Sequence, residues 1–121
     1  MSEIATSNRQ ITFIYNSESV RAKKALALVQ TKGLPIREID VLTTKLTGEQ
    51  IAEIAGSLKL SVQDMVNEEH PYFKEHFGNA EFSDMDLLTM IEHNPQILKQ
   101  PIAMLGDKTI LVDTPTDVLQ L

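Results

Sequence analysis

The chain has 121 residues and no cysteine, and its 17 Asp and Glu outnumber its 11 Lys and Arg to give a formal net charge of −6. Length and composition, with 42% hydrophobic residues and five each of Gly and Pro, are those of one folded domain. The absence of cysteine excludes disulfides, thiolate nucleophiles, zinc–thiolate sites and iron–sulfur clusters, and the negative charge argues against direct binding of nucleic acid.

The first third of the chain predicts a β-α-β unit. Residues 11–15 are β-branched and aromatic and read as a buried strand, and residues 35–41 read as a second strand with Pro35 at its edge. Between them, residues 20–31 show helical spacing of apolar residues and stop at Lys32-Gly33. Because the connection runs through a helix, we expect the two strands to be parallel.

The middle of the chain, residues 47–93, predicts a helical block. Thr47 and Ser83 each begin a capping signal in front of an apolar helical face, and Ser61 begins one before a short helix that ends near Asn67. The block also holds an aromatic group for which we expect core packing, with an exposed patch for a partner as the alternative. These aromatic residues are Tyr72, Phe73, Phe77 and Phe82.

After Pro101 the pattern changes to short strands. Residues 102–105 and 109–112, separated by Gly106-Asp107-Lys108, predict a hairpin. Thr114-Pro115 then predicts a last short helix, which carries Val118, Leu119 and Leu121. The order is β-α-β, helices, β-β, α, so we predict a single α/β domain over residues 1–121 with a helical insertion at about 47–93.

Charge is distributed unevenly along the chain. Residues 1–60 carry eight Lys and Arg against six Asp and Glu, whereas residues 61–121 carry three against eleven. An acidic surface of this kind serves solubility or docks a basic partner. No apolar run approaches the roughly 18 residues of a membrane span and no leader is visible, so we expect a cytoplasmic protein without membrane contact.

Four stretches carry a resemblance to a known family. Residues 16–26 look like a strand–loop–helix segment with the pattern Asn-Pro-x-Cys, and residues 60–67 are similar to a Ser-Val-x-x-Leu-Leu-Arg stretch. Residues 94–102 and 114–118 look like Pro-x-Leu-x-x-Arg-Pro-Ile and Arg-Pro-x-x-Val segments. Together they resemble the arsenate reductase (ArsC-like) family and its Spx-type relatives over residues 11–121.

This resemblance implies a thioredoxin-like fold with a mixed sheet. It also implies that the Gln100–Pro101 peptide bond is cis and lies against the loop that carries the family's cysteine. In relatives the backbone before that proline pairs with an extended thiol peptide. The alternative is that Pro101 only shapes the entry into the hairpin.

The departures from the family pattern decide the expected function. Ser19 stands where the family has its nucleophilic cysteine, in a loop that begins at Asn16. Asn67, Gln100 and Thr114 stand where the reductases place the arginines that hold the oxyanion. A serine hydroxyl does not ionise in the field of a helix N-terminus, and it cannot form the disulfides that the redox chemistry needs. Neutral side chains also cannot replace the paired, charge-assisted hydrogen bonds that an arginine donates to an oxyanion.

We therefore predict an inactive relative of the reductases that acts through protein or peptide contacts, with the remnant site Asn16, Ser19, Asn67, Gln100, Pro101 and Thr114. We expect Ser19 to cap the first helix rather than attack a substrate. Spx-type relatives imply that this scaffold binds transcription machinery, but this chain lacks their redox switch. The alternative is an enzyme or binder of glutathione or a small anion, built on Ser19, Tyr15, Asn67 and Gln100.

We predict neither a metal site nor a cofactor. His70, His76 and His93 lie six and seventeen residues apart, whereas two ligands on one helical face need a spacing of about three or four. Ordinary surface or half-buried roles are expected for all three histidines.

Overall fold

Residues 6–78 and 80–121 are described by the computed structural model, and their contacts divide them into two units. The sheet unit comprises residues 6–44 and 100–121, and the helical unit comprises residues 45–99 without residue 79. The expected single domain over residues 1–121 stays a prediction. No helix in the described part of the chain is long and apolar enough to cross a membrane.

The sheet unit contains four strands in the order β2-β1-β3-β4. The strands are β1 (Ile11–Tyr15), β2 (Ile36–Asp40), β3 (Ile102–Leu105) and β4 (Lys108–Leu111). β1 and β2 are parallel, with Tyr15 beside Asp40, and the β1–β3 and β3–β4 pairs are antiparallel. The mixed sheet and the hairpin expected from the sequence are confirmed.

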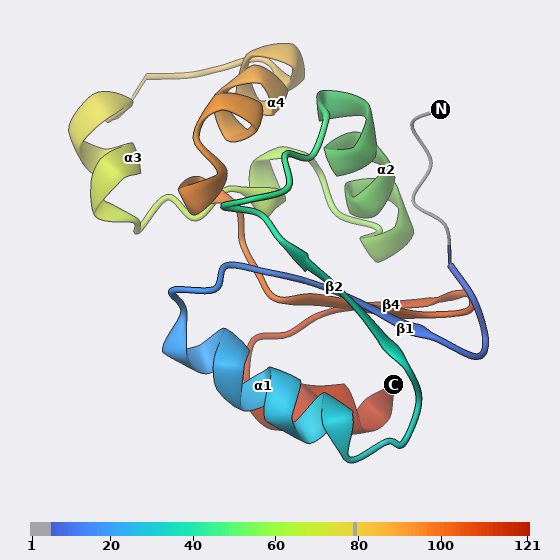
Figure 1. The fold of residues 1–121 in the computed structure, drawn as a ribbon. Helices are drawn as coiled ribbons and strands as arrows, with labels where there is room; N and C mark the ends of the chain where they lie inside the picture. The colour runs from blue at the N-terminus through green and yellow to red at the C-terminus, as the bar shows by residue number, and fades with distance from the viewer. Residues whose placement is uncertain (1–5, 79) are drawn as a thin grey trace. The chain divides into compact units, whose positions relative to one another are not determined.

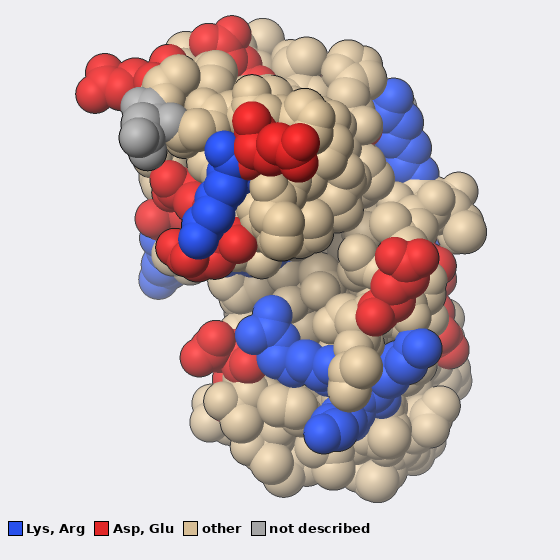
Figure 2. Space-filling model, turned by 90° about the vertical axis from the view of Figure 1, so that its left-hand side faces the viewer, with Lys and Arg blue, Asp and Glu red and all other residues tan. Residues whose placement is uncertain are grey.

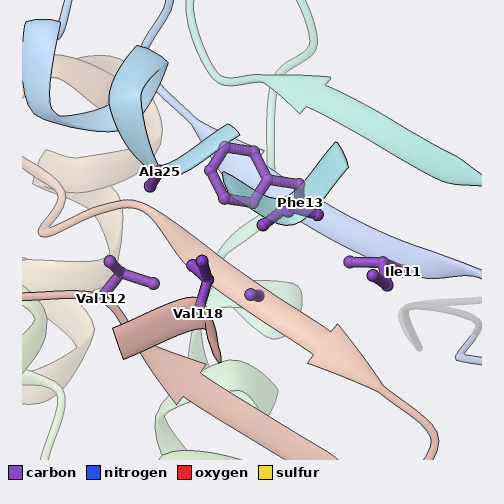
Figure 3. Packing of buried hydrophobic residues seen from close by; sticks show 7 residues of the cluster. Ile11, Phe13, Ala25, Val112 and Val118 are labelled. Carbon is purple, nitrogen blue, oxygen red and sulfur yellow. The ribbon is translucent and has the colours of Figure 1, made fainter. Parts of the chain in front are cut away.

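One face of this sheet is covered by α1 (Val20–Gln30) and by the C-terminal 3-10 helix η3 (Pro115–Gln120), which lie side by side (Figure 1). Figure 3 shows Phe13 of β1 pointing toward Ala25 of α1 and toward Val118 of η3. The fully or almost fully buried residues of this core are Ile11, Phe13, Ala25, Val29, Ala103, Val112 and Val118. Apolar residues spaced by two on the strands and by three or four on α1 therefore meet in one layer.

The helical unit holds the remaining helices. They are α2 (Gly48–Leu58), α3 (Pro71–His76) and α4 (Asp84–His93), with the single 3-10 turns η1 (Gln63–Met65) and η2 (Pro95–Ile97). Thr47 and Ser83 form the expected capping boxes at the starts of α2 and α4. The aromatic group packs internally, with Phe77 in ring contact with Phe73 at 5.6 Å and with Phe82 at 6.0 Å.

Two expected helices differ from the structure. The helix after Ser61 is a single 3-10 turn, because Val66 is extended and forms a β-bridge with Leu98 instead of continuing the helix. The last helix is also a 3-10 helix, and its tighter winding leaves Leu119 52% exposed while Val118 is buried.

Candidate functional site

Three segments that are distant in sequence meet at the start of α1. The backbone N–H of Asn16 donates to the side-chain oxygen of Gln100 at 3.1 Å. The Arg21 guanidinium donates to the carbonyl oxygen of Gln100 at 3.1 Å and to that of Asp113 at 3.3 Å. The sheet unit thus joins the loop after β1, the turn before β3 and the segment after β4.

Ser19 caps α1, as the sequence predicts. Its hydroxyl accepts a hydrogen bond from the backbone N–H of Ala22 at 3.1 Å, and its backbone is extended, as a cap residue requires. Its own N–H donates to the Asn16 carbonyl at 2.9 Å. The residue that the resemblance places at the position of the family's cysteine therefore caps a helix in this chain.

The backbone donors of the loop 16–19 are all used within the sheet unit. Ser17 N–H donates to the Asp40 carboxylate at 3.2 Å, and Glu18 N–H donates to the Asn16 side chain at 2.8 Å. Together with the Asn16 and Ser19 bonds, four consecutive N–H groups have protein acceptors. An oxyanion at this loop would have to displace those acceptors, one of which is itself a carboxylate.

Asp40 holds the loop from the end of β2. Burial raises the pKa of its carboxyl, but hydrogen bonds from Ser17 and from the Leu42 N–H outweigh burial and lower the pKa below its usual value. The carboxylate is therefore ionised at neutral pH and is a strong acceptor for both N–H groups. Sequence analysis did not single out this residue.

Tyr15, a candidate in the ligand-binding alternative, donates its hydroxyl hydrogen to Glu38 at 2.7 Å. That hydrogen bond, burial, and the negative charges of Glu38 and Asp40 raise the pKa of the Tyr15 hydroxyl to about 12. The hydroxyl is therefore neutral at physiological pH. It does not supply a base or an anion to the site.

Gln100 and Thr114 have defined places in this unit. The Gln100–Pro101 bond is cis, as the resemblance implies, and the Pro101 carbonyl accepts from the Val112 N–H at 2.8 Å. Thr114 precedes η3, and its N–H donates to the Asp117 carboxylate at 2.9 Å. Each position assigned to a family arginine in this unit thus carries a neutral side chain.

Arg21 is a second site residue, after Asp40, that sequence analysis did not single out. It lies two residues after the cap, and its side chain is 46% exposed while it holds the Gln100 and Asp113 carbonyls. The available signal was a lone arginine in the first turn of α1, close to the remnant cysteine position. The start of α1 therefore carries a cation, whose hydrogen bonds go to the carbonyl oxygens of Gln100 and Asp113.

Asn67 belongs to the helical unit, so its expected place beside the other residues stays a prediction. Its N–H donates to the Ile97 carbonyl at 2.7 Å, and its side chain accepts from Glu69 N–H at 3.2 Å. Two histidines also have local structural roles. His70 caps α3 by accepting from Tyr72 N–H, and a ring nitrogen of His76 lies 3.1 Å from the Tyr72 carbonyl.

No family model matches the chain. It is 25% identical over 114 residues to the global transcriptional regulator Spx of Lactiplantibacillus plantarum, with 91% of this chain and 84% of that protein covered. It is also 25% identical over 114 residues to an arsenate reductase of Haemophilus influenzae, covering 92% of this chain and 97% of the reductase.

Solved structures show the same fold. An arsenate reductase from Vibrio cholerae superimposes with a TM-score of 0.84 at 22% identity, over 94% of this chain and 98% of that one. An arsenate reductase (ArsC) related protein from Brucella melitensis gives a TM-score of 0.71 at 13% identity, over 97% and 100%. The predicted thioredoxin-like α/β fold and the resemblance to both kinds of protein are confirmed.

Proposed function

We propose that this chain, a homologue of the Spx regulators and the ArsC-type arsenate reductases with their thioredoxin-like fold, does not reduce arsenate and acts through contacts with another protein. The proposal that the chain does not reduce arsenate rests on the absence of cysteine from all 121 residues. The position that the resemblance assigns to the nucleophile holds Ser19, whose hydroxyl caps a helix.

The chemistry of arsenate reduction explains why this loss matters. A thiolate attacks the arsenic centre as an oxygen leaves as water, and attack by a second thiol then forms a disulfide, so that two electrons pass from the two thiols to arsenic. A serine hydroxyl has no such oxidation cycle, and its pKa lies far above neutral. Gln100 and Thr114 offer no positive charge to the oxyanion, and the N–H groups of the loop 16–19 already have protein acceptors.

Two observations support a role in protein contacts. One relative, at 25% identity, is described as a global transcriptional regulator. The helical unit is strongly acidic, with ten Asp and Glu against four Lys and no Arg in residues 45–99. A surface of one sign favours association with a partner of the opposite sign.

Arg21 is the observation that favours the alternative of an anion or glutathione ligand. Its guanidinium is half exposed and lies beside the carbonyls of Gln100 and Asp113. Against this, the Asp113 carboxylate lies 3.9 Å from the guanidinium and Asp40 accepts from the adjoining loop. These negative charges lower the affinity of this region for an anion.

Titration of the isotope-labelled chain with arsenate, phosphate, sulfate and glutathione distinguishes the two functions. We expect the amide signals of residues 15–23 and 99–102 to stay unchanged up to millimolar ligand, because the N–H groups of residues 16–19 already have protein acceptors and carboxylates lie close by. Arg21→Gln is the matched variant, since it removes the cation while keeping a polar, uncharged side chain at the same position. Saturable shifts that disappear in Arg21→Gln would establish the anion-binding alternative.

A further inference from the structure

We infer that the groove between α2 and α4 of the helical unit docks a basic amphipathic helix of another protein. The inference rests on the proposed function, because it names the surface and the chemistry of the partner. The groove has a volume of about 440 Å³ and is lined only by residues of α2, its cap and α4. It therefore lies wholly within one unit.

The lining of the groove is apolar with carboxylates. Ala52 of α2 and Met85 and Leu88 of α4 supply apolar surface. Met85 is 72% exposed, and it is the most exposed large hydrophobic side chain recorded in the described part of the chain. An exposed methionine beside a half-buried leucine offers adaptable apolar contact, which suits an anchor side chain from a partner.

The charge of the groove indicates the charge of the partner that it would bind. Glu49 on α2 and Glu92 on α4 belong to its lining, and that lining contains neither Lys nor Arg. Asp84 and Asp86 lie in the first turn of the same α4. Figure 2, which looks onto the helical unit from the side of α3 rather than onto the groove, shows several acidic side chains there, in agreement with the unit's excess of Asp and Glu. Lys or Arg flanking an apolar anchor would complement this charge.

The shape of the groove fits a helical segment. The lining on α4 runs from Met85 to Glu92, which at 1.5 Å per residue is about 10 Å or roughly two helical turns, and the lining on α2 runs from its cap Thr47 to Ala52. The end of the groove at Gly48 is fixed, because Gly48 N–H donates to the Glu92 carboxylate at 2.6 Å. A helix with apolar residues at positions i, i+3 or i+4, and i+7 would place anchors along such a wall.

The test uses the full chain, isotope-labelled, and a synthetic helical peptide of about 16 residues with a leucine stripe and flanking lysines. We expect saturable shifts of amide signals in α2 and α4, none at residues 16–19, and weaker binding at higher salt. A peptide with glutamate in place of every lysine is the charge control and is not expected to bind.

Met85→Ser is the variant that tests the groove, and Val20→Ser is its matched control. Val20 is an exposed apolar residue on α1 of the other unit, at 66% exposure. We expect Met85→Ser to weaken peptide binding about fivefold or more, since an apolar contact is lost, and Val20→Ser to leave it unchanged. Both sites are exposed, so both variants are expected to fold.

Three results would overturn the inference. The first is that the peptide shifts amide signals outside α2 and α4. The second is that Met85→Ser binds the peptide with the same affinity as the wild type. The third is that the α2 and α4 signals change with protein concentration in the absence of peptide, which would make a second copy of this chain the occupant of the groove. The reduction of arsenate is measured in a separate assay. A failure of the docking proposal and a failure of the proposed loss of arsenate reduction are therefore detected in different experiments.

Discussion

Phe13→Ala is expected to destabilise the sheet unit by about 3–5 kcal/mol, the largest effect of any substitution considered. Phe13 is fully buried on the central strand β1 and packs in the cluster that joins the sheet to α1 and η3. Its ring centroid lies 5.3 Å from that of Tyr15, so an aromatic contact is lost together with the buried area. Chemical denaturation and amide exchange of the β1 signals measure the loss.

Val20→Ala is the control for this substitution. Val20 lies in the same unit but on the exposed side of α1, and its truncation is expected to change stability by no more than about 0.5 kcal/mol. A cost below about 1 kcal/mol for Phe13→Ala would contradict the packing described for this core.

Asp40→Ala is expected to destabilise the sheet unit by about 1–3 kcal/mol at neutral pH. The carboxylate accepts from Ser17 N–H at 3.2 Å and from Leu42 N–H at 3.1 Å, so the substitution leaves two loop donors without their acceptor. We also expect the amide signals of residues 16–19 to move, because the loop before α1 loses its anchor on β2.

The same residue gives a pH dependence with a definite sign. The pKa of Asp40 is lower in the folded chain than its ordinary value of 3.8, so the folded state binds its proton less readily than the unfolded state. The stabilisation is therefore complete above about pH 4 and is lost as the pH falls through the folded pKa. The difference between wild type and Asp40→Ala is expected to shrink on acidification.

Asp113→Ala is the matched control for Asp40→Ala. The Asp113 side chain is 94% exposed and lies 3.9 Å from Arg21, an exposed ion pair whose loss costs at most about 0.5–1 kcal/mol. Equal losses for the two aspartates, or a loss for Asp40→Ala that does not change with pH, would contradict the role assigned to Asp40.

Local chemistry explains which parts of the fold the sequence predicts. The capping boxes at Thr47 and Ser83 and the cap at Ser19 depend on residues three positions apart, so they are visible without knowledge of the fold. The hairpin of residues 102–112 is equally local. The cis bond at Pro101, by contrast, was expected from the resemblance alone.

Long-range partners explain what the sequence does not predict. Ser61 caps a turn as expected, but the helix ends early because Val66 pairs with Leu98, a residue 32 positions later. Arg21 finds its carbonyl acceptors 79 and 92 positions away, and Asp40 accepts from a loop 23 positions earlier. No local pattern marks these residues as parts of one site.

The variant Ser19→Cys tests whether the neutral residues Gln100 and Thr114 by themselves prevent arsenate reduction. Ser19→Cys restores a thiol at the position of the family's nucleophile, while Gln100 and Thr114 remain neutral. We expect this variant to stay inactive, because the thiol alone does not hold the oxyanion. Rapid turnover by Ser19→Cys would show that the serine substitution alone removes the activity.

Conversion of arsenic(V) to arsenic(III) by the purified wild-type chain, in the presence of thiol reductants and their carrier proteins, tests the loss of reductase chemistry most directly. We predict that arsenic(III) forms no faster than in the same mixture without this chain. A rate that rises in proportion to the concentration of the cysteine-free protein would contradict the account.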